Sequence, residues 1–310
     1  MPMLEMVAKI ALQMGLGLVF APVLAGAVKK IKARLQHRQG PPLLQPWFDL
    51  RKLFRKRMAR SATTSWLFDV PPFLEFGVAL FLLAVIAGPM ALNSGRQFGV
   101  DLFFILYLLA LGRFFGALAG LDAGSAFGGM GSSREMTIAA MVEPGLILTL
   151  FLLGFKAGSL NLNQIFGWAA ADGGWFVSPL YLFSAGAFFM LLIAETGRIP
   201  VDNPDTHLEL TMIHEGMILE YSGPYLALVS WAAMIRQYLF YGIFVNLFWP
   251  DPPSTGIIPG VILFLLKLLL TGLLVAVTES SLAKMRLLKV PRLLLGAFAL
   301  GLMGLVTVIF

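Results

Sequence analysis

Apolar residues along this chain gather in long runs separated by short polar stretches. Eight runs approach or exceed the roughly 20 residues that an α-helix needs to cross the hydrocarbon core of a bilayer. They cover residues 4–28, 69–93, 100–122, 137–156, 176–195, 219–248, 258–279 and 293–310. No internal repeat or low-complexity linker divides them. The pattern therefore predicts an all-α, polytopic membrane protein with about eight transmembrane helices, in a single domain over residues 1–310.

The composition agrees with this pattern. Of the 310 residues, 58% are hydrophobic and 13% are charged, whereas soluble chains average about 45–50% and about 25%. The chain has no cysteine, which excludes a thiolate-bound iron–sulfur cluster, a disulfide and a cysteine-based zinc site in it. Its three histidines leave little room for a bis-histidine haem.

The polar stretches differ sharply in positive charge. The first connection, residues 29–60, holds eleven Lys and Arg residues. The first, third, fifth and seventh connections together hold 17, and the second, fourth and sixth together hold two. Cytoplasmic loops carry an excess of Lys and Arg, so the odd-numbered connections are predicted to be cytoplasmic and both termini periplasmic. The net charge of +6 then indicates topology rather than binding to nucleic acid.

Within the first basic connection, residues 43–58 have the pattern of an interfacial amphipathic helix. Apolar residues recur at helical spacing on one face and charged residues occupy the other: Leu43, Trp47, Leu50 and Phe54 against Asp49, Lys52 and Lys56. Such a helix is expected to lie along the lipid headgroups. Two interpretations stay open, a lipid-anchored connector and a docking platform for a peripheral protein.

The same connection carries a motif. Its residues are Arg34, Gln36, Arg38, Gly40 and Pro41, then Gln45, Pro46, Asp49, Lys52 and Leu53. This frame resembles the first cytoplasmic loop of the complex I membrane subunit that forms the quinone chamber, and of its relatives in energy-converting nickel–iron (NiFe) hydrogenases. The complex I form usually has a few more residues and a second Gly-Pro between the two halves. Their absence here favours the hydrogenase branch.

The third cytoplasmic connection resembles the same family. Its matching residues are Glu195, Thr196, Arg198, Pro200, Asp202, Glu209, Leu210, Glu220, Tyr221 and Ser222. In the second connection, a flexible loop rich in Gly and Ser is expected before residue 137, and Arg134 precedes Glu143 by nine residues, as it does in the family. His214 and Glu215 do not begin a zinc-protease motif, because residue 218 is Ile rather than His.

The resemblance covers essentially the whole chain and implies a membrane subunit of a group 4 NiFe hydrogenase complex of the formate hydrogenlyase or hydrogenase-4 type. It implies no cofactor in this chain, with the NiFe centre and iron–sulfur clusters in the large and small subunits of a peripheral arm; quinone binding stays open. Antiporter-like membrane subunits and membrane lipids are the other implied partners, and the bacterial inner membrane is the implied location. Residues expected to dock the arm are Arg34, Gln36, Arg38, Asp49, Lys52, Arg134 and Arg198.

Charged residues within or beside the apolar runs are candidate proton-carrying groups, because such residues are costly in a bilayer and often mark functional paths. The candidates are Glu143, Glu195, Glu209, Glu220, Asp202 and Lys267. The acids at matching positions line the proposed proton path of the family. An alternative stays open, in which each glutamate pairs with Arg134 or Arg198 and only holds helices together. Arg113 and Arg236 also lie within runs, and Glu75 is expected to be a simple residue at the membrane face.

The expected function is therefore to anchor the peripheral arm and to link its redox chemistry to proton translocation. One alternative is the quinone-binding membrane subunit of NADH:quinone oxidoreductase. Another is a free-standing secondary transporter, for which paired discontinuous helices in two matching halves are typical; no such symmetry is visible in this sequence.

Overall fold

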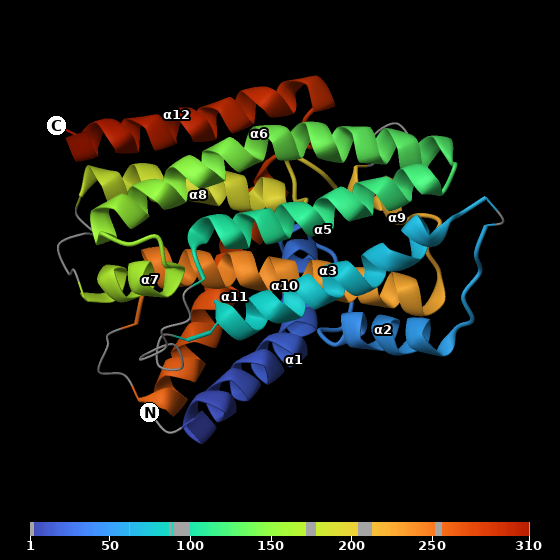
Figure 1. The fold of residues 1–310 in the computed structure, drawn as a ribbon, viewed down its shortest axis with the longest axis horizontal. Helices are drawn as coiled ribbons and strands as arrows, with labels where there is room; N and C mark the ends of the chain where they lie inside the picture. The colour runs from blue at the N-terminus through green and yellow to red at the C-terminus, as the bar shows by residue number, and fades with distance from the viewer. Residues whose placement is uncertain are drawn as a thin grey trace.

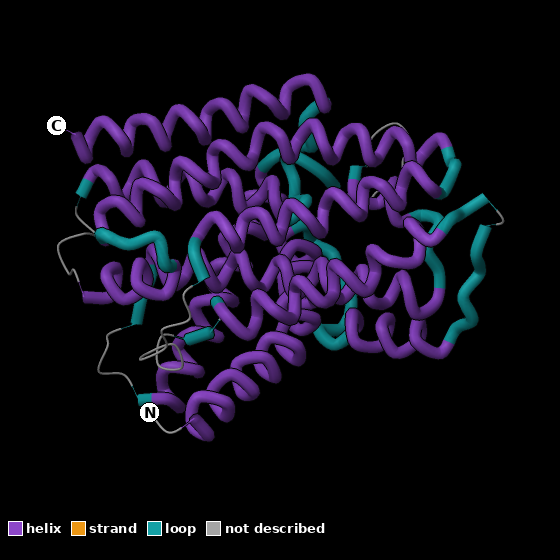
Figure 2. Tube along the Cα trace, viewed as in Figure 1, coloured by secondary structure: helices purple, strands orange, loops and turns teal. Residues whose placement is uncertain are grey.

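The computed structural model describes residues 3–61, 63–86, 88–89, 100–171, 178–203, 213–251 and 256–309. Its helices are α1 (Met3–Leu35), α2 (Gln45–Arg55), α3 (Trp66–Val85), α5 (Leu102–Asp122), α6 (Ala126–Ala157), α7 (Leu162–Ala171), α8 (Pro179–Glu195), α9 (His214–Ile218), α10 (Gly223–Phe248), α11 (Ile257–Ser281), η2 (Leu287–Lys289) and α12 (Val290–Ile309). Within these ranges no β-strand is present, as Figure 2 shows. The predicted all-α fold class is confirmed.

Among the described residues, seven helical segments are long and apolar enough to cross a membrane. They are α1, α3, α5, α6, α10, α11 and the segment Leu287–Ile309, which contains α12. The apolar helix α8 has 17 residues and is shorter than these seven. These eight elements correspond to the eight predicted runs, and α7 is an additional helix that the hydropathy pattern did not predict.

The expected flexible loop before residue 137 is wrong, because α6 begins at Ala126. Ser125 caps this helix by accepting a hydrogen bond from the backbone N–H of Gly128. A Cβ at Gly128 would clash with the Gly120 carbonyl of α5, and one at Gly131 would lie 2.9 Å from the Ile213 carbonyl. The small residues therefore serve close packing of α6 against α5 and the chain around α9, rather than loop flexibility.

The arrangement of the helices brings the predicted cytoplasmic connections to one end of the molecule. Most helices run along its long axis, and both described chain ends lie at the same end (Figure 1). The described part of the α2–α3 connection (residues 56–61 and 63–65) and the α5–α6 turn (residues 123–125) lie at the other end, called the loop end below. Near the middle of the bundle, every residue of α10 from Gln237 to Phe248 is buried.

The amphipathic helix is present as α2, and the middle of its apolar stripe packs on protein, while Leu43 and Phe54 at the two ends of the stripe are exposed. Leu50 is 2% exposed. The rings of Trp47 and Trp231 of α10 meet edge to face with centroids 5.6 Å apart. Trp47 Nε1 also donates a hydrogen bond to the Val19 carbonyl of α1 at 3.2 Å. This helix therefore lies against α1 and α10, and its tryptophan anchors it to the bundle.

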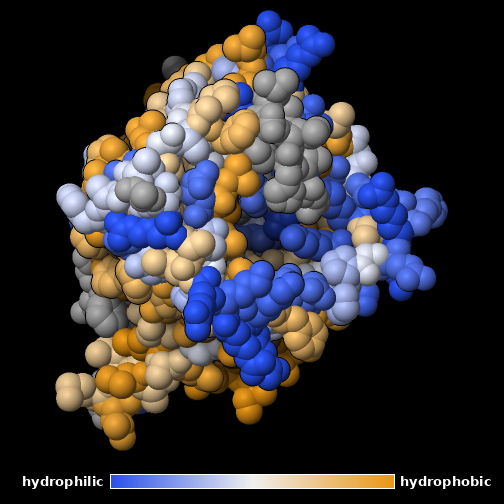
Figure 3. All heavy atoms as spheres, turned by 90° about the vertical axis from the view of Figure 1, so that its right-hand side faces the viewer, coloured by the Kyte–Doolittle hydropathy of each residue, from blue (hydrophilic) through white to orange (hydrophobic). Residues whose placement is uncertain are grey.

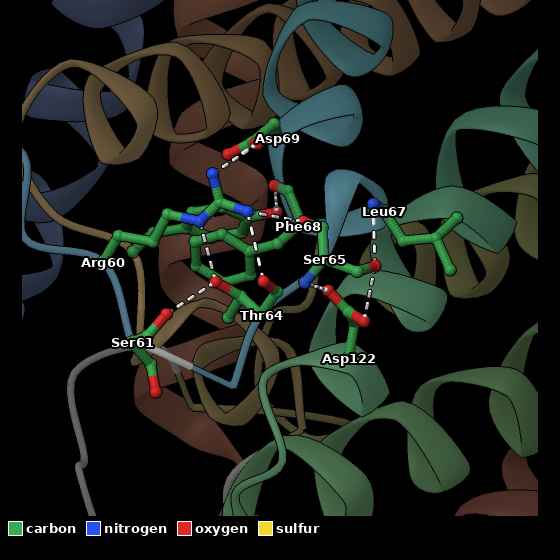
Figure 4. A network of polar contacts seen from close by, with 9 residues as sticks. Arg60, Ser61, Thr64, Ser65, Leu67, Phe68, Asp69 and Asp122 are labelled. Carbon is green, nitrogen blue, oxygen red and sulfur yellow. Dashed lines mark hydrogen bonds and ion pairs between the residues drawn. The ribbon is translucent and has the colours of Figure 1, made fainter.

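A polar network fixes the connection between α2 and α3 at the loop end (Figure 4). Arg60 donates to the carbonyls of Thr64 at 3.1 Å and Ser65 at 3.0 Å, and it pairs with Asp69 at 2.9 Å. Ser65 donates from its hydroxyl and its backbone N–H to the two oxygens of Asp122, at 2.8 and 2.7 Å. Charge-assisted bonds of this kind are stronger than neutral ones, so the connection is tied to α3 and to the end of α5.

Candidate functional site

A buried arginine on α5 binds a carboxylate at the end of α8. Arg113 is 8% exposed, and its Nη2 donates to both oxygens of Glu195 at 2.7 and 2.6 Å. Taking two charges out of water is costly, so the loss of either partner would leave an uncompensated buried charge. The alternative drawn from the sequence paired each glutamate with Arg134 or Arg198, whereas the structure pairs Glu195 with Arg113.

Two carboxylates of α6 approach the same arginine. Glu143 lies 3.6 Å from Nη1 of Arg113, and Glu135 lies 3.9 Å from its Nε. The two glutamates are eight residues apart, which places them on one face of a helix. The side chain of Glu143 is 42% exposed and that of Glu195 is 2% exposed. These four residues, the Arg113 cluster, therefore extend from the outside of the bundle into its interior.

An interior cavity of about 220 Å³ adjoins this cluster. Its lining includes charged, histidine and amide side chains from α1, α2, α6, α8, the chain after α8, α9 and α10: Lys29, Asp49, Glu135, Glu195, Arg198, Asp202, His214, Glu215, Arg236 and Gln237. Lys29 and Asp49 are exposed, so the lining reaches the molecular surface. Figure 3, which faces the loop end, shows hydrophilic side chains around a hollow. A polar space of this size can hold several water molecules.

Two smaller cavities, each of about 30 Å³, lie on either side of Arg113. Glu143 and Glu195 line the first, and Glu75 and Arg236 line the second. Glu75 was expected to be a simple residue at the membrane face. The structure instead places it between α3, α5 and α10, next to the arginines, so the polar interior continues beyond the cluster.

Asp202 and His214 meet on the wall of the interior cavity. Asp202 accepts hydrogen bonds from Lys284 Nζ at 2.8 Å and from the backbone N–H of His214 at 3.3 Å. Burial is the main cause that lowers the pKa of His214 to about 4. The positive charges of Arg236 and Arg113 also lower this pKa, and the negative charge of Asp202 raises it. His214 is therefore neutral near pH 7. Its Nε2 has no hydrogen-bond partner in the described part of the chain.

A second buried ion cluster joins α11 to α1 and to the chain after α8. The side chain of Glu279 is fully buried, 3.4 Å from Lys32 and 3.8 Å from Arg198. Arg198, which is 6% exposed, donates from Nη2 to Gln237 at 2.6 Å. Gln237 in turn donates to the hydroxyl of Tyr241. Arg198, predicted as a docking residue, thus lies in the interior of the bundle.

Most of the other predicted docking residues lie at the surface. Arg34, Gln36, Arg38, Asp49 and Lys52 are exposed, at the end of α1, after it and on α2. Gln36, Arg38 and Asp49 line a surface groove of about 430 Å³ together with Lys29 and Lys32. Arg134 is half-buried on α6 and lies apart from this group, in a small pocket beside Lys284 and Met285.

Not all predicted proton-path residues come together. Glu220 is exposed between α9 and α10. Lys267 pairs with Asp251 and donates to the carbonyls of Trp249 and Pro250 after α10, at the end opposite the loop end. Glu209 lies outside the described residues. Of the predicted residues, Glu143 and Glu195 thus contact Arg113, and Asp202 lines the adjoining cavity. Glu220 and Lys267 belong to neither group.

Three features of this interior were not predicted from the sequence. Glu135 carried a usable signal, because its spacing from Glu143 places both on one face of α6. Arg113 was predicted to be buried and could continue a polar axis, but nothing in its own helix indicates its partners on α6 and α8. Glu279 carried no signal, because its partners Lys32 and Arg198 are distant in the chain. Among the described residues, no group of three or more His, Cys, Asp or Glu could hold a metal ion.

The chain is similar to several known proteins over most of its length. The chain is 35% identical over 280 residues to hydrogenase-4 component C of Escherichia coli, covering 87% of this chain and 86% of that protein. It is 31% identical over 298 residues to formate hydrogenlyase subunit 4 of the same organism, covering 93% and 94%. A subunit of the NADH-quinone oxidoreductase of Geobacter sulfurreducens is 34% identical over 234 residues, covering 70% and 68%.

The fold has a counterpart among solved structures. A chain of the membrane-bound sulfane sulfur reductase, an archaeal respiratory membrane complex, superposes with a TM-score of 0.84 at 19% identity, covering 96% of this chain and 98% of that one. The family model described as NADH dehydrogenase matches residues 8–309. This match spans nearly the whole chain and agrees with the three relatives, so the chain belongs to the NADH dehydrogenase family.

Proposed function

We propose that this chain is the membrane subunit of a NiFe hydrogenase complex of the hydrogenase-4 or formate hydrogenlyase type. In this role it anchors the peripheral arm in the inner membrane and links redox chemistry in that arm to proton translocation. The large and small hydrogenase subunits of the arm and antiporter-like membrane subunits are its proposed partners. The NiFe centre and the iron–sulfur clusters belong to those partner subunits, and this chain supplies the charged path.

The Arg113 cluster is the observation that carries the proposal. A membrane anchor alone needs no buried charge, and ionisable groups within a bilayer are costly enough that they are kept for function. Here three carboxylates surround one arginine, and two of them, Glu135 and Glu195, also line the interior cavity. A proton can be held on a carboxylate oxygen of this cluster and exchanged with water in the cavity, while the fixed charge of Arg113 limits how many carboxylates are protonated together.

The first connection favours the hydrogenase branch over complex I. It lacks the few extra residues and the second Gly-Pro that the complex I form usually has between the two halves of its motif. The interior cavity also fits water better than a quinone. Its volume of about 220 Å³ lies below the roughly 300–1,000 Å³ of pockets that hold drug-sized ligands, and charged side chains line it where such pockets are mostly apolar.

The test separates coupling from redox chemistry in membranes that contain the whole complex. Two activities are measured, one with a soluble artificial dye and one that depends on the membrane arm or on the proton gradient. Glu143→Gln, which keeps the size of the side chain but cannot ionise, should leave dye-linked activity nearly unchanged and lower the membrane-dependent activity about tenfold or more. The ratio of the two activities, called the coupling ratio below, is compared at matched subunit content.

Glu5→Gln is the control, because Glu5 is an exposed acid near the other end of the bundle that pairs only with the neighbouring Lys9 among its described contacts. It should leave both activities unchanged. Glu195→Gln provides a second variant at the centre of the cluster. A coupling ratio that stays at the wild-type value in both cluster variants would contradict the proposed role in proton translocation. Purification of the chain without hydrogenase subunits would contradict the proposed partners.

A further inference from the structure

Glu279 lies between one cation that lines the surface groove and another that lines the adjoining interior cavity. Its side chain, in the last turn of α11, is fully buried. On one side it faces Lys32, which lines the groove, with 3.4 Å between Nζ and Oε2. On the other side it faces Arg198, which lines the cavity, with 3.8 Å between Nη1 and Oε1. One carboxylate therefore bridges a cation of the groove and a cation of the cavity, two spaces whose linings also share Lys29 and Asp49.

Both contacts of this carboxylate are loose. A charge-assisted hydrogen bond between nitrogen and oxygen is usually about 2.7–2.9 Å long, and neither oxygen of Glu279 has a hydrogen-bond partner in the described part of the chain. Buried polar groups in native proteins nearly always have such a partner. Glu279 is thus shared between two cations, and it can move toward one of them when the other is drawn away, because buried charges interact strongly over short distances.

Lys32 and Arg198 each lie next to a region that is described above. Lys32 belongs to the last turn of α1, which leads to the exposed Arg34 and Arg38. Arg198 follows Glu195 by three residues and donates to Gln237 at 2.6 Å on the cavity wall. A change at the groove can therefore reach the cavity next to the Arg113 cluster through only two ion pairs.

We propose that Glu279 is a positioning residue that transmits docking of the peripheral arm to the proton path. An acidic group of the arm enters the groove and attracts Lys32 away from Glu279. The carboxylate then closes on Arg198 and draws it from Gln237, which changes the polar lining beside Glu195. Only ion pairs and hydrogen bonds are exchanged in this step. The inference rests on the proposed function, since it needs both an arm and a proton path.

The first test measures the coupling ratio in Glu279→Gln and in Lys32→Gln, in membranes with matched subunit content. Each variant breaks the link at one point, so each should lower the ratio severalfold while dye-linked activity stays close to that of the wild type. A merely structural role of Glu279 predicts a different outcome. Loss of its charge would leave two buried cations without a counter-ion, so the complex would lose stability and both activities would decline together.

The double variant Lys32→Gln/Glu279→Gln separates the two roles even if a single variant assembles poorly. It removes one positive and one negative charge, so the net charge of the Lys32–Glu279–Arg198 cluster is the same as in the wild type. If Glu279 only balances charge, the double variant should recover the stability and the coupling ratio. If Glu279 transmits docking, the double variant should recover stability but stay uncoupled. Recovery of the wild-type ratio in the double variant would overturn the proposal.

Glu143→Gln, measured in the same series, distinguishes failure of this inference from failure of the proposed function. If Glu143→Gln uncouples the complex and the Glu279 variants do not, the proton path stands and Glu279 has no part in it. If none of the variants changes the coupling ratio, the proposed function itself is wrong.

Discussion

Nη2 of Arg113 donates to both carboxylate oxygens of Glu195, which joins the middle of α5 to the last residue of α8 inside the bundle. The bond sits at the point where the interior cavity meets the two glutamates of α6. Its position makes this ion pair both a packing contact between two helices and the fixed positive charge of the proposed proton path.

Loss of Arg113 should destabilise the protein strongly. Arg113→Met leaves Glu195 buried without its partner, and breaking a buried pair in this way costs about 3–5 kcal/mol. The double variant Arg113→Met/Glu195→Met should regain part of that stability, because apolar replacement of a whole buried pair is often neutral. Thermal unfolding of the detergent-solubilised complex measures both. Equal stability of Arg113→Met and the wild type would show that the pair does not hold α5 to α8.

Glu220 should not take part in proton movement, although the sequence motif includes it. It is exposed and lines none of the described cavities that adjoin the Arg113 cluster. We expect Glu220→Gln to keep the coupling ratio of the wild type in membranes where Glu143→Gln lowers it. A reduced ratio with unchanged dye-linked activity in Glu220→Gln would mean that the path extends to the start of α10.

Stability should fall between pH 6.5 and pH 4 because of His214. An unfolded histidine takes up a proton near pH 6.5, whereas burial lowers the pKa of His214 to about 4. The unfolded state thus binds more protons in this window, so the contribution of His214 is fully present above about pH 6.5 and is lost as the pH falls, by at most about 3 kcal/mol. The unfolding temperature is measured over this range.

His214→Gln should flatten that pH dependence, because glutamine does not titrate. His37→Asn is the matched control: His37 is exposed and has a φ of 57°, a left-handed conformation that Asn adopts readily. If His214→Gln keeps the full acid sensitivity of the wild type, groups other than His214 determine it.

Charge reversal in the first connection should release the peripheral arm. Arg38 lines the surface groove and Lys52 is exposed on α2, so Arg38→Glu/Lys52→Glu places two repelling charges where an acidic partner would bind. The fraction of hydrogenase activity that sediments with the membranes should drop, and the chain itself should stay in the membrane. Lys156→Glu, near the other end of α6, is the control. An arm that remains bound and active after both reversals rules out docking at these residues.

The loop end should face the cytoplasm. Since the chain has no native cysteine, Ser61→Cys at the loop end and Lys156→Cys at the other end can be labelled one at a time with an impermeant thiol reagent. In intact cells only Lys156→Cys should react, and in permeabilised cells both should. Labelling of Ser61→Cys from outside would reverse the topology that the charge asymmetry predicts.

The membrane-spanning helices, the charge asymmetry, the amphipathic α2 and the motif residues that carry the family resemblance could all be predicted from the sequence. Each of these is a local property: a run of apolar residues, a count of Lys and Arg, or a periodic stripe. The start of a helix was harder to predict where Gly and Ser serve close packing between helices instead of loop flexibility. The Gly- and Ser-rich segment before residue 137 predicted a loop, yet it starts α6, because small residues let α6 pack closely against α5.

Which charges meet depends instead on how the helices pack. A soluble helix shows its buried face by the contrast between polar and apolar sides, but a helix such as α5 or α10 in a bilayer is apolar all round, so its rotation about its own axis is not encoded in the pattern. Packing against the neighbouring helices sets that rotation. It turned Arg113 toward Glu195 and placed Arg134 in a separate pocket beside Lys284. It also buried Glu279 between Lys32 and Arg198, residues from three distant parts of the chain that no local signal connects.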